Sequence, residues 1–234
     1  ASTDLAVGGS LSITATTGDI TQGAALAITG AATFITTANN RSIVLDQSGN
    51  VFTSTVTMKA GNGSNATFNN ITFVDSAAVR LHSSAASAGD LFIDASTDLA
   101  VGGSLSITAT TGNITQGSEL AVGTTSTFTT SASNGTITLN DVDNTFTGAV
   151  ALNTTGSSGN ATVVNDVGLD FAASTVGGAL SATAITGDIS DSGNLAITGA
   201  ATFITTANNR SIILDQPGSV FTSTVTMQAG NGSA

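Results

Sequence analysis

The stretch LAITGAATFITTANNRSI occupies residues 26–43 and recurs letter for letter at residues 195–212. A second run, ASTDLAVGGSLSITATTG, stands at 1–18 and again at 95–112, and a looser copy, STVGGALSATAITGDI, follows at 174–189. Internal repetition at this scale restricts the fold more than any single motif does. The chain therefore divides into three sequence modules, predicted at 1–94, 95–169 and 170–234, the last of them truncated. We expect one continuous segment of a longer protein.

The spacing of the copies suggests how large the structural unit is. The modules start at positions 1, 95 and 170, so their offsets are 94 and 75, and these differ by 94 − 75 = 19. If one stacked unit has about this length, the first module contains one unit more than the second, roughly within residues 68–88. This predicts about twelve coils of roughly 19 residues, stacked into a rod of about 60 Å.

The local pattern indicates which kind of stack forms. Runs such as LSITA, LAITG and LFID alternate apolar and small polar residues, as a strand with one buried face does, and no stretch keeps a helical spacing. Between them lie clusters that turn the chain, such as TTGD, SGN and AGNGSN. Short strands joined by tight turns predict an all-β fold, a parallel β-helix. The predicted inward set is Leu26, Ile28, Phe34, Ile43, Leu45, Phe52, Val56 and Met58.

Composition excludes several classes of partner. Only 8% of the residues are charged, and the net charge is −11, so no basic stripe is available to follow a nucleic-acid backbone. The chain has no cysteine, which excludes disulfides and cysteine zinc sites. No apolar run reaches the length of a membrane-spanning helix, and no segment has the pattern of a signal peptide.

Two phrases carry a resemblance to a known family. VGGSLSITATTGDITQGAALAITGAATF and SIVLDQSGNVFTSTVTM look like the repeat region of large filamentous-haemagglutinin-like bacterial exoproteins and related giant β-strand-repeat surface proteins. The resemblance covers nearly the whole chain. It implies a right-handed β-helix at the bacterial cell surface, outside the cell, which acts as an adhesin shaft or a fibre. Its expected partners are adjoining coils, identical subunits or a surface receptor.

Candidate chemistry is sparse. His82, the only histidine, lies beside Arg80 and near Asp75, Asp90 and Asp94, a set that would suit a general acid or a metal ligand. A solvent-facing histidine is the stronger interpretation, because a metal site would need further nitrogen or sulfur ligands. The sequence therefore predicts no catalytic residue, no cofactor site and no metal site.

Other polar residues recur with the repeats. Arg41 and Arg210 occupy the same place in two copies of TANNRS, which favours a role in a turn over carboxylate binding. The turn aspartates could bind calcium, but the glycine-aspartate nonapeptide of calcium-binding solenoids is missing. These positions are Asp19, Asp188, Asp46 and Asp215, with Asn113 replacing the aspartate in the middle copy. Glycosylation sequons include Asn65, Asn70, Asn153 and Asn160.

Two other functions fit a β-helix. Threonine triplets such as TAT at 14–16 and TST at 53–55 would suit an ice-binding face, but they do not recur once per predicted coil. A polysaccharide-active enzyme would need clustered carboxylates and a basic group, and the chain has four Lys and Arg residues in all. The sequence therefore favours a non-enzymatic shaft or fibre segment.

Overall fold

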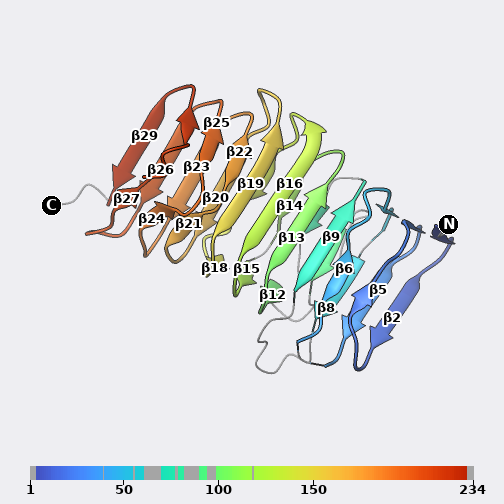
Figure 1. Ribbon diagram of the computed structural model, residues 1–234. Coiled ribbons are helices and arrows are strands. Elements are labelled where there is room, and N and C mark those ends of the chain that lie inside the picture. Colours follow the sequence, from blue (N-terminus) through green and yellow to red (C-terminus); the bar gives the residue numbers. More distant parts are fainter. Residues whose placement is uncertain are drawn as a thin grey trace.

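The computed structural model describes residues 4–38, 40–54, 56–60, 70–76, 79–81, 90–93, 99–117 and 119–230. These residues form strands joined by turns, stacked along one axis with the two chain ends at opposite ends of the stack (Figure 1). The first eight strands are β1 (Leu5–Val7), β2 (Leu11–Ala15), β3 (Ile20–Thr21), β4 (Leu26–Ile28), β5 (Ala32–Thr36), β6 (Ile43–Leu45), β7 (Val51–Phe52) and β8 (Val56–Ala60).

The remaining strands include two further sets of eight. Three connecting strands come first: β9 (Ile71–Asp75), β10 (Val79–Leu81) and β11 (Asp90–Ile93). The second set is β12 (Leu99–Val101), β13 (Leu105–Ala109), β14 (Ile114–Gln116), β15 (Leu120–Val122), β16 (Ser126–Ser133), β17 (Ile137–Leu139), β18 (Thr145–Phe146) and β19 (Val150–Thr155). Two connecting strands follow, β20 (Ala161–Asn165) and β21 (Leu169–Phe171). The third set is β22 (Ser174–Val176), β23 (Leu180–Ala184), β24 (Ile189–Asp191), β25 (Leu195–Ile197), β26 (Ala201–Thr205), β27 (Ile212–Ile213), β28 (Val220–Phe221) and β29 (Val225–Ala229).

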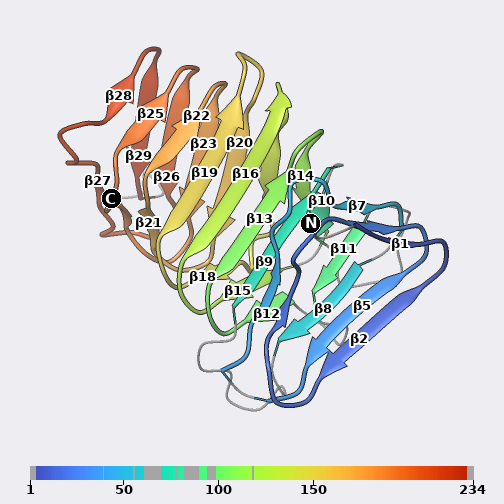
Figure 2. The same ribbon diagram turned by 45° about the vertical axis from the view of Figure 1, so that its right-hand side comes forward.

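Every strand pairing in the described chain is parallel, and most join a strand to the third strand after it. The 11-stranded sheet contains β2, β5, β8, β11, β14, β17, β20, β23, β26 and β29, with β10 between β11 and β14. Figure 2 shows β2, β5 and β8 together at the N-terminal end and β22, β25 and β28 together at the C-terminal end. A coil of three short strands is the expected form of a parallel β-solenoid, so the predicted fold class is confirmed.

The coil length predicted from the repeat offsets is wrong. In β2, β5 and β8, Leu11 pairs with Ala32 and Ala32 with Val56, so the steps along the sequence are 32 − 11 = 21 and 56 − 32 = 24. Ala161 pairs with Leu180, a step of 180 − 161 = 19. The predicted coil length of 19 residues is therefore found at this step but not at the two steps above. The coils are therefore longer and fewer than the twelve predicted. A sheet of 11 strands is about 48 Å long at about 4.8 Å per strand, instead of about 60 Å.

The error has a structural cause, because the repeat spacing does not equal a whole number of coils. The first and second sets of eight strands start 11 strands apart, and the second and third start 10 strands apart. Neither number is a multiple of three. The LSITA strand β2 consequently lies in the 11-stranded sheet, whereas its identical copy β13 lies in the 12-stranded sheet beside β9 and β16. The third copy of this strand, β23, lies 21 strands after β2. Because 21 is a multiple of three, β23 is again in the 11-stranded sheet that contains β2.

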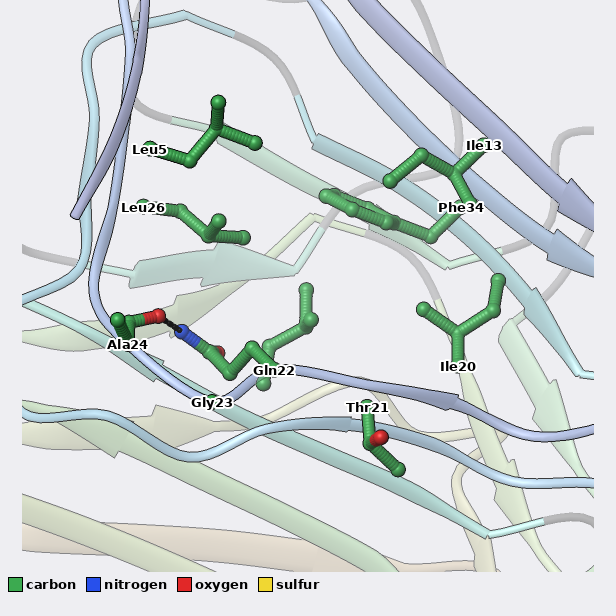
Figure 3. Close-up of a pocket in the computed structure, with 10 residues that line it drawn as sticks. Leu5, Ile13, Ile20, Thr21, Gln22, Gly23, Ala24, Leu26 and Phe34 are labelled. Atoms are coloured by element: carbon green, nitrogen blue, oxygen red, sulfur yellow. Dashed lines mark hydrogen bonds between the residues drawn. The ribbon is translucent and has the colours of Figure 1, made fainter. Parts of the chain in front are cut away.

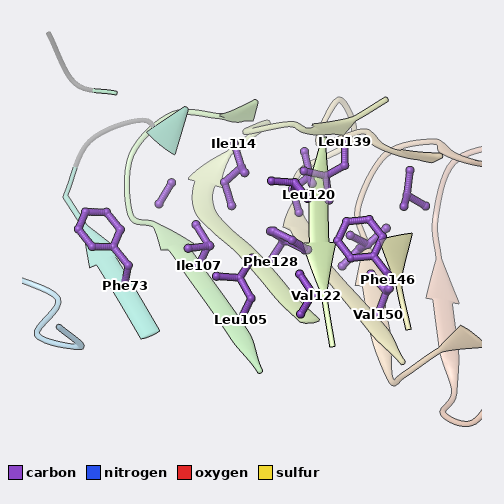
Figure 4. Close-up of a cluster of buried hydrophobic side chains, with 14 of the residues drawn as sticks. Phe73, Leu105, Ile107, Ile114, Leu120, Val122, Phe128, Leu139, Phe146 and Val150 are labelled. Atoms are coloured by element: carbon purple, nitrogen blue, oxygen red, sulfur yellow. The ribbon is translucent and has the colours of Figure 1, made fainter. Parts of the chain in front are cut away.

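Inward side chains form one continuous apolar core. All eight residues predicted to face inward are buried, with exposed fractions of 7% or less. Phenylalanine pairs recur in each set of eight strands: Phe34 with Phe52, Phe128 with Phe146 and Phe203 with Phe221, with ring centroids 6.3, 6.0 and 6.1 Å apart. Each pair is edge-on, the arrangement that aromatic quadrupoles favour. Figure 4 shows Phe73, Phe128 and Phe146 within the cluster of buried aliphatic residues.

At one corner, coils approach so closely that only glycine fits. A Cβ added to Gly199 would lie 2.5 Å from the carbonyl carbon of Gly178, and one added to Gly30 would lie 2.6 Å from that of Gly9. The obstructing atoms belong to the backbone of the preceding coil, so a side-chain rotation cannot relieve the clash.

Replacement of this corner glycine should therefore destabilise the fold. We expect Gly199→Ala to lower the free energy of unfolding by roughly 1–3 kcal/mol, the usual cost of overpacking. Gly18→Ala is the matched control, because its Cβ would meet no atom within 4 Å. Chemical denaturation followed by circular dichroism measures both variants, and equal stabilities would contradict the close approach described above.

Candidate functional site

The residues proposed around His82 do not form a described site. His82 and Asp94 lie outside the described residues, and Arg80 and Asp90 are paired through the backbones of β10 and β11. Asp75 is buried at 2% exposure, and its Oδ1 accepts the backbone N–H of Phe52 at 3.3 Å. This carboxylate therefore supports a backbone amide of the preceding coil.

The turn aspartates link successive coils. The backbone N–H of Ser42 donates to Asp19 Oδ1 at 2.9 Å, and that of Ser211 donates to Asp188 Oδ1 at 2.8 Å. In the middle copy, the N–H of Thr136 donates to Asn113 Oδ1 at 2.8 Å. An amide oxygen in the middle copy thus accepts the same hydrogen bond as the carboxylate oxygens in the other two copies. The function of this position is to accept a hydrogen bond, which needs no negative charge and no cation.

The other repeated polar residues are two aspartates and two arginines. Within the described ranges, no group of three or more His, Cys, Asp or Glu residues is close enough to hold a metal ion. Asp46 Oδ1 accepts the side chain of Gln47, and Asp215 donates its backbone N–H to Asp191 Oδ1 at 2.9 Å. Arg41 is partly buried and Arg210 exposed, both at the turn that precedes the β6 or β27 strand.

Three of the sequon asparagines also link coils. Asn70, Asn153 and Asn160 accept backbone N–H groups through Oδ1 from Ser104, Thr175 and Ala179, at 2.8, 3.3 and 2.8 Å. Asn65 lies outside the described residues. The side-chain oxygens of these residues extend the backbone ladder through the turns.

A buried asparagine and a partly buried glutamine form a pair of reciprocal amide hydrogen bonds. Gln22 Nε2 donates to Asn50 Oδ1 at 2.7 Å, and Asn50 Nδ2 donates back to Gln22 Oε1 at 2.9 Å. Asn50 Oδ1 also accepts the backbone N–H of Leu26 at 3.0 Å. We call this arrangement the amide clasp. It recurs between Gln116 and Asn144, and both asparagines are 0% exposed.

The third module lacks the amide clasp. Asp191 stands at the place of Gln22 and Gln116, and Ser219 at the place of Asn50 and Asn144. Ser219 Oγ still accepts the N–H of Leu195, at 3.0 Å. Asp191 is only 6% exposed, and its Oδ2 has no hydrogen-bond partner. A poorly hydrated carboxylate oxygen without a hydrogen-bond partner is unfavourable. The buried polar atoms at this position are therefore less completely hydrogen-bonded than those of the amide clasp in the first two modules.

Both ends of the stack expose the inside of the solenoid. At the N-terminal end, Leu5, Ile13 and Ile20 of the first coil line a hollow of about 260 Å³ that reaches Leu26 and Phe34 of the second (Figure 3). At the C-terminal end, Val225 and Met227 are 37% and 51% exposed. Their copies in the first module, Val56 and Met58, are 2% and 0% exposed.

These features define a β-solenoid built from repeats, with polar side chains linking its coils at the corners. The chain belongs to the family described as repeats of unknown function, DUF5649, whose model matches residues 2–59, 88–153 and 158–228. Each match covers nearly all of one set of eight strands. Neither the curated proteins nor the solved structures give a match to this chain. In the described part of the chain, no helix is long and apolar enough to cross a membrane.

Calcium should have no effect on the turn that contains Asp188. Since Asn113 accepts the same hydrogen bond as Asp188, we expect Asp188→Asn to leave the melting temperature unchanged. Addition of calcium or of a chelator should not shift the melting temperature of either form. A calcium-dependent rise that is lost in Asp188→Asn would show that the turn is a cation site.

The missing amide clasp can be rebuilt in the third module. The double substitution Asp191→Gln with Ser219→Asn should restore the paired amides and remove a buried carboxylate. We expect a gain of about 1–2 kcal/mol in the free energy of unfolding. Each single variant should gain less than half of this, because each lacks its partner. Additive single effects in a double-mutant cycle would contradict a restored clasp.

Proposed function

We propose that the chain is a non-enzymatic structural segment of an extracellular bacterial surface protein, in which it acts as an adhesin shaft or as the subunit of a self-assembling fibre. The resemblance of its repeats to filamentous-haemagglutinin-like exoproteins supports the location at the cell surface. The chemistry of the turns supports a structural role, because polar side chains there are engaged in links between coils.

One observation carries the proposal. Met58 and Met227 occupy the same position in two copies of VFTSTVTM, yet the first is fully buried and the second is 51% exposed. The difference lies in what covers them. Among the described strands, β8 is paired on both sides, by β5 and β11, whereas β29 is paired on one side, with β26. The open coil is thus chemically equivalent to one that another coil covers inside the same chain.

The strand edges support the same conclusion. β29 and β2 are the end strands of the 11-stranded sheet, so their outer N–H and C=O groups face no further strand of it. Unpaired edges of this kind accept another parallel strand readily. Coil-on-coil stacking therefore supplies both the hydrogen bonds and the apolar contact, and the proposed partners are further coils of the same protein or a second copy.

The two methionines provide a matched test. Met58→Asp should unfold the protein or lower its stability by several kcal/mol, because it buries an unpaired charge. Met227→Asp should leave the melting temperature nearly unchanged, because its side chain is exposed. In sedimentation velocity, we expect the unmodified chain to form end-to-end oligomers as its concentration rises, and Met227→Asp to remain monomeric.

The same experiment includes the outcomes that would overturn the proposal. A chain that stays monomeric at all concentrations would exclude assembly through the open coil. Oligomers that persist in Met227→Asp would place the contact on another surface. Turnover of a polysaccharide by the purified chain would replace the structural role by an enzymatic one.

A further inference from the structure

One column of outward side chains in the 11-stranded sheet consists of hydroxyl residues. In the C-terminal part of the sheet, each of its strands from β14 to β29 places a threonine or serine at the same register position. The column is Thr115, Thr138, Thr162, Ser181, Thr202 and Thr226. We call it the hydroxyl row. A shorter run of the same kind, Ser12, Thr33 and Thr57, occupies β2, β5 and β8.

The hydroxyl row is straight and regular because the backbone fixes it. Each member pairs in register with the next, so the hydroxyls follow one another at the strand spacing of about 4.8 Å. Five such steps extend over about 24 Å. Inward neighbours such as Val163 and Ala182 anchor each strand in the core, with 0% exposure. The row is therefore a rigid, linear array.

The hydroxyls of the row are not used by the protein. Within the described residues, no side chain of the row forms a hydrogen bond, and the five residues from Thr115 to Thr202 are partly exposed while Thr226 is exposed. Threonines at the corners behave differently: Thr186 Oγ1 donates to Asp166 O at 2.6 Å and Thr206 Oγ1 to Ile185 O at 2.8 Å. The row thus offers donors and acceptors to a molecule outside the protein.

We propose that the hydroxyl row binds an ordered lattice of water, and that the chain thereby adsorbs to ice. A threonine presents a methyl group, which water surrounds without bonding, next to a hydroxyl that replaces one water of the lattice. Repetition at a fixed spacing on a rigid face aligns these groups without the entropy cost of ordering flexible side chains. No charged residue belongs to the row, so no strongly hydrated group disturbs the water layer.

The chemistry of the row favours water over a sugar polymer. Carbohydrates are commonly held by stacking on tryptophan or tyrosine, and the chain contains neither. In the sequence, the threonine triplets do not recur at a fixed interval, and this irregularity argues against an ice-binding face. The structure removes that objection, because coils of unequal length bring single hydroxyl residues into one column.

The test uses the whole chain and three variants. Ice recrystallisation and partition into a growing ice front are measured for the unmodified chain and for Thr162→Lys, which places a charged, bulky side chain at an inner position of the row. Thr175→Lys is the matched control, on an exposed threonine of β22 in the other sheet. Thr162→Val keeps the shape and the methyl groups but removes one hydroxyl. Circular dichroism melting confirms that each variant is folded.

We expect the unmodified chain and Thr175→Lys to inhibit recrystallisation and to enter the ice, and Thr162→Lys to lose both activities. Thr162→Val should be intermediate. Failure of the unmodified chain to act on ice would overturn the inference, and so would equal activity of Thr162→Lys. Binding to insoluble cellulose or chitin without activity on ice would overturn it too, by assigning the row to a glycan. These outcomes are independent of end-to-end assembly, which Met227→Asp reports.

Discussion

The structure depends on the parallel pairing of each strand with its equivalent one coil away. This pairing places most inward residues on an apolar residue of the next coil, so apolar columns continue through the rod. Phe34 lies in register between Ile13 and Met58, and Phe128 lies in register between Ile107 and Leu152. A charge in such a column would face its neighbours at the strand spacing, which explains why only 8% of the residues are charged.

The corners have to satisfy the backbone where the strands stop. Side-chain oxygens take over there, as when Asp19, Asn113 and Asp188 each accept an amide from the following coil. The amide clasp does the same for Leu26 and Leu120 in a fully buried position. Because an asparagine and an aspartate are interchangeable at the turn, geometry and not charge determines the residue. Much of the net charge of −11 lies at such turns, away from the hydroxyl row.

The sequence predicts the strands well and the coil poorly. Alternation identifies the inward residues from Leu26 to Met58, because burial of one strand face is a local property. The coil length depends on the lengths of the turns as well as on the strands. The difference between the two repeat offsets does not equal one coil, because the connecting segments between the sets of eight strands differ in both strand number and turn length. The hydroxyl row was not predictable for the same reason. Thr138 is followed in the row by Thr162 and then by Ser181, so one step is 162 − 138 = 24 and the next 181 − 162 = 19. No fixed period in the sequence reveals a column whose steps vary.

Variable steps also determine what the surface presents. The identical strands β2 and β13 lie in different sheets because 11 strands separate them, a number that three does not divide. The sequence LSITA therefore contributes Ser12 to the hydroxyl residues of one sheet and Ser106 to the other sheet. Its third copy, LSATA, returns to the first sheet and supplies Ser181 to the hydroxyl row. The number of connecting strands, and not the repeat sequence alone, sets the side of the rod on which a repeated residue is displayed.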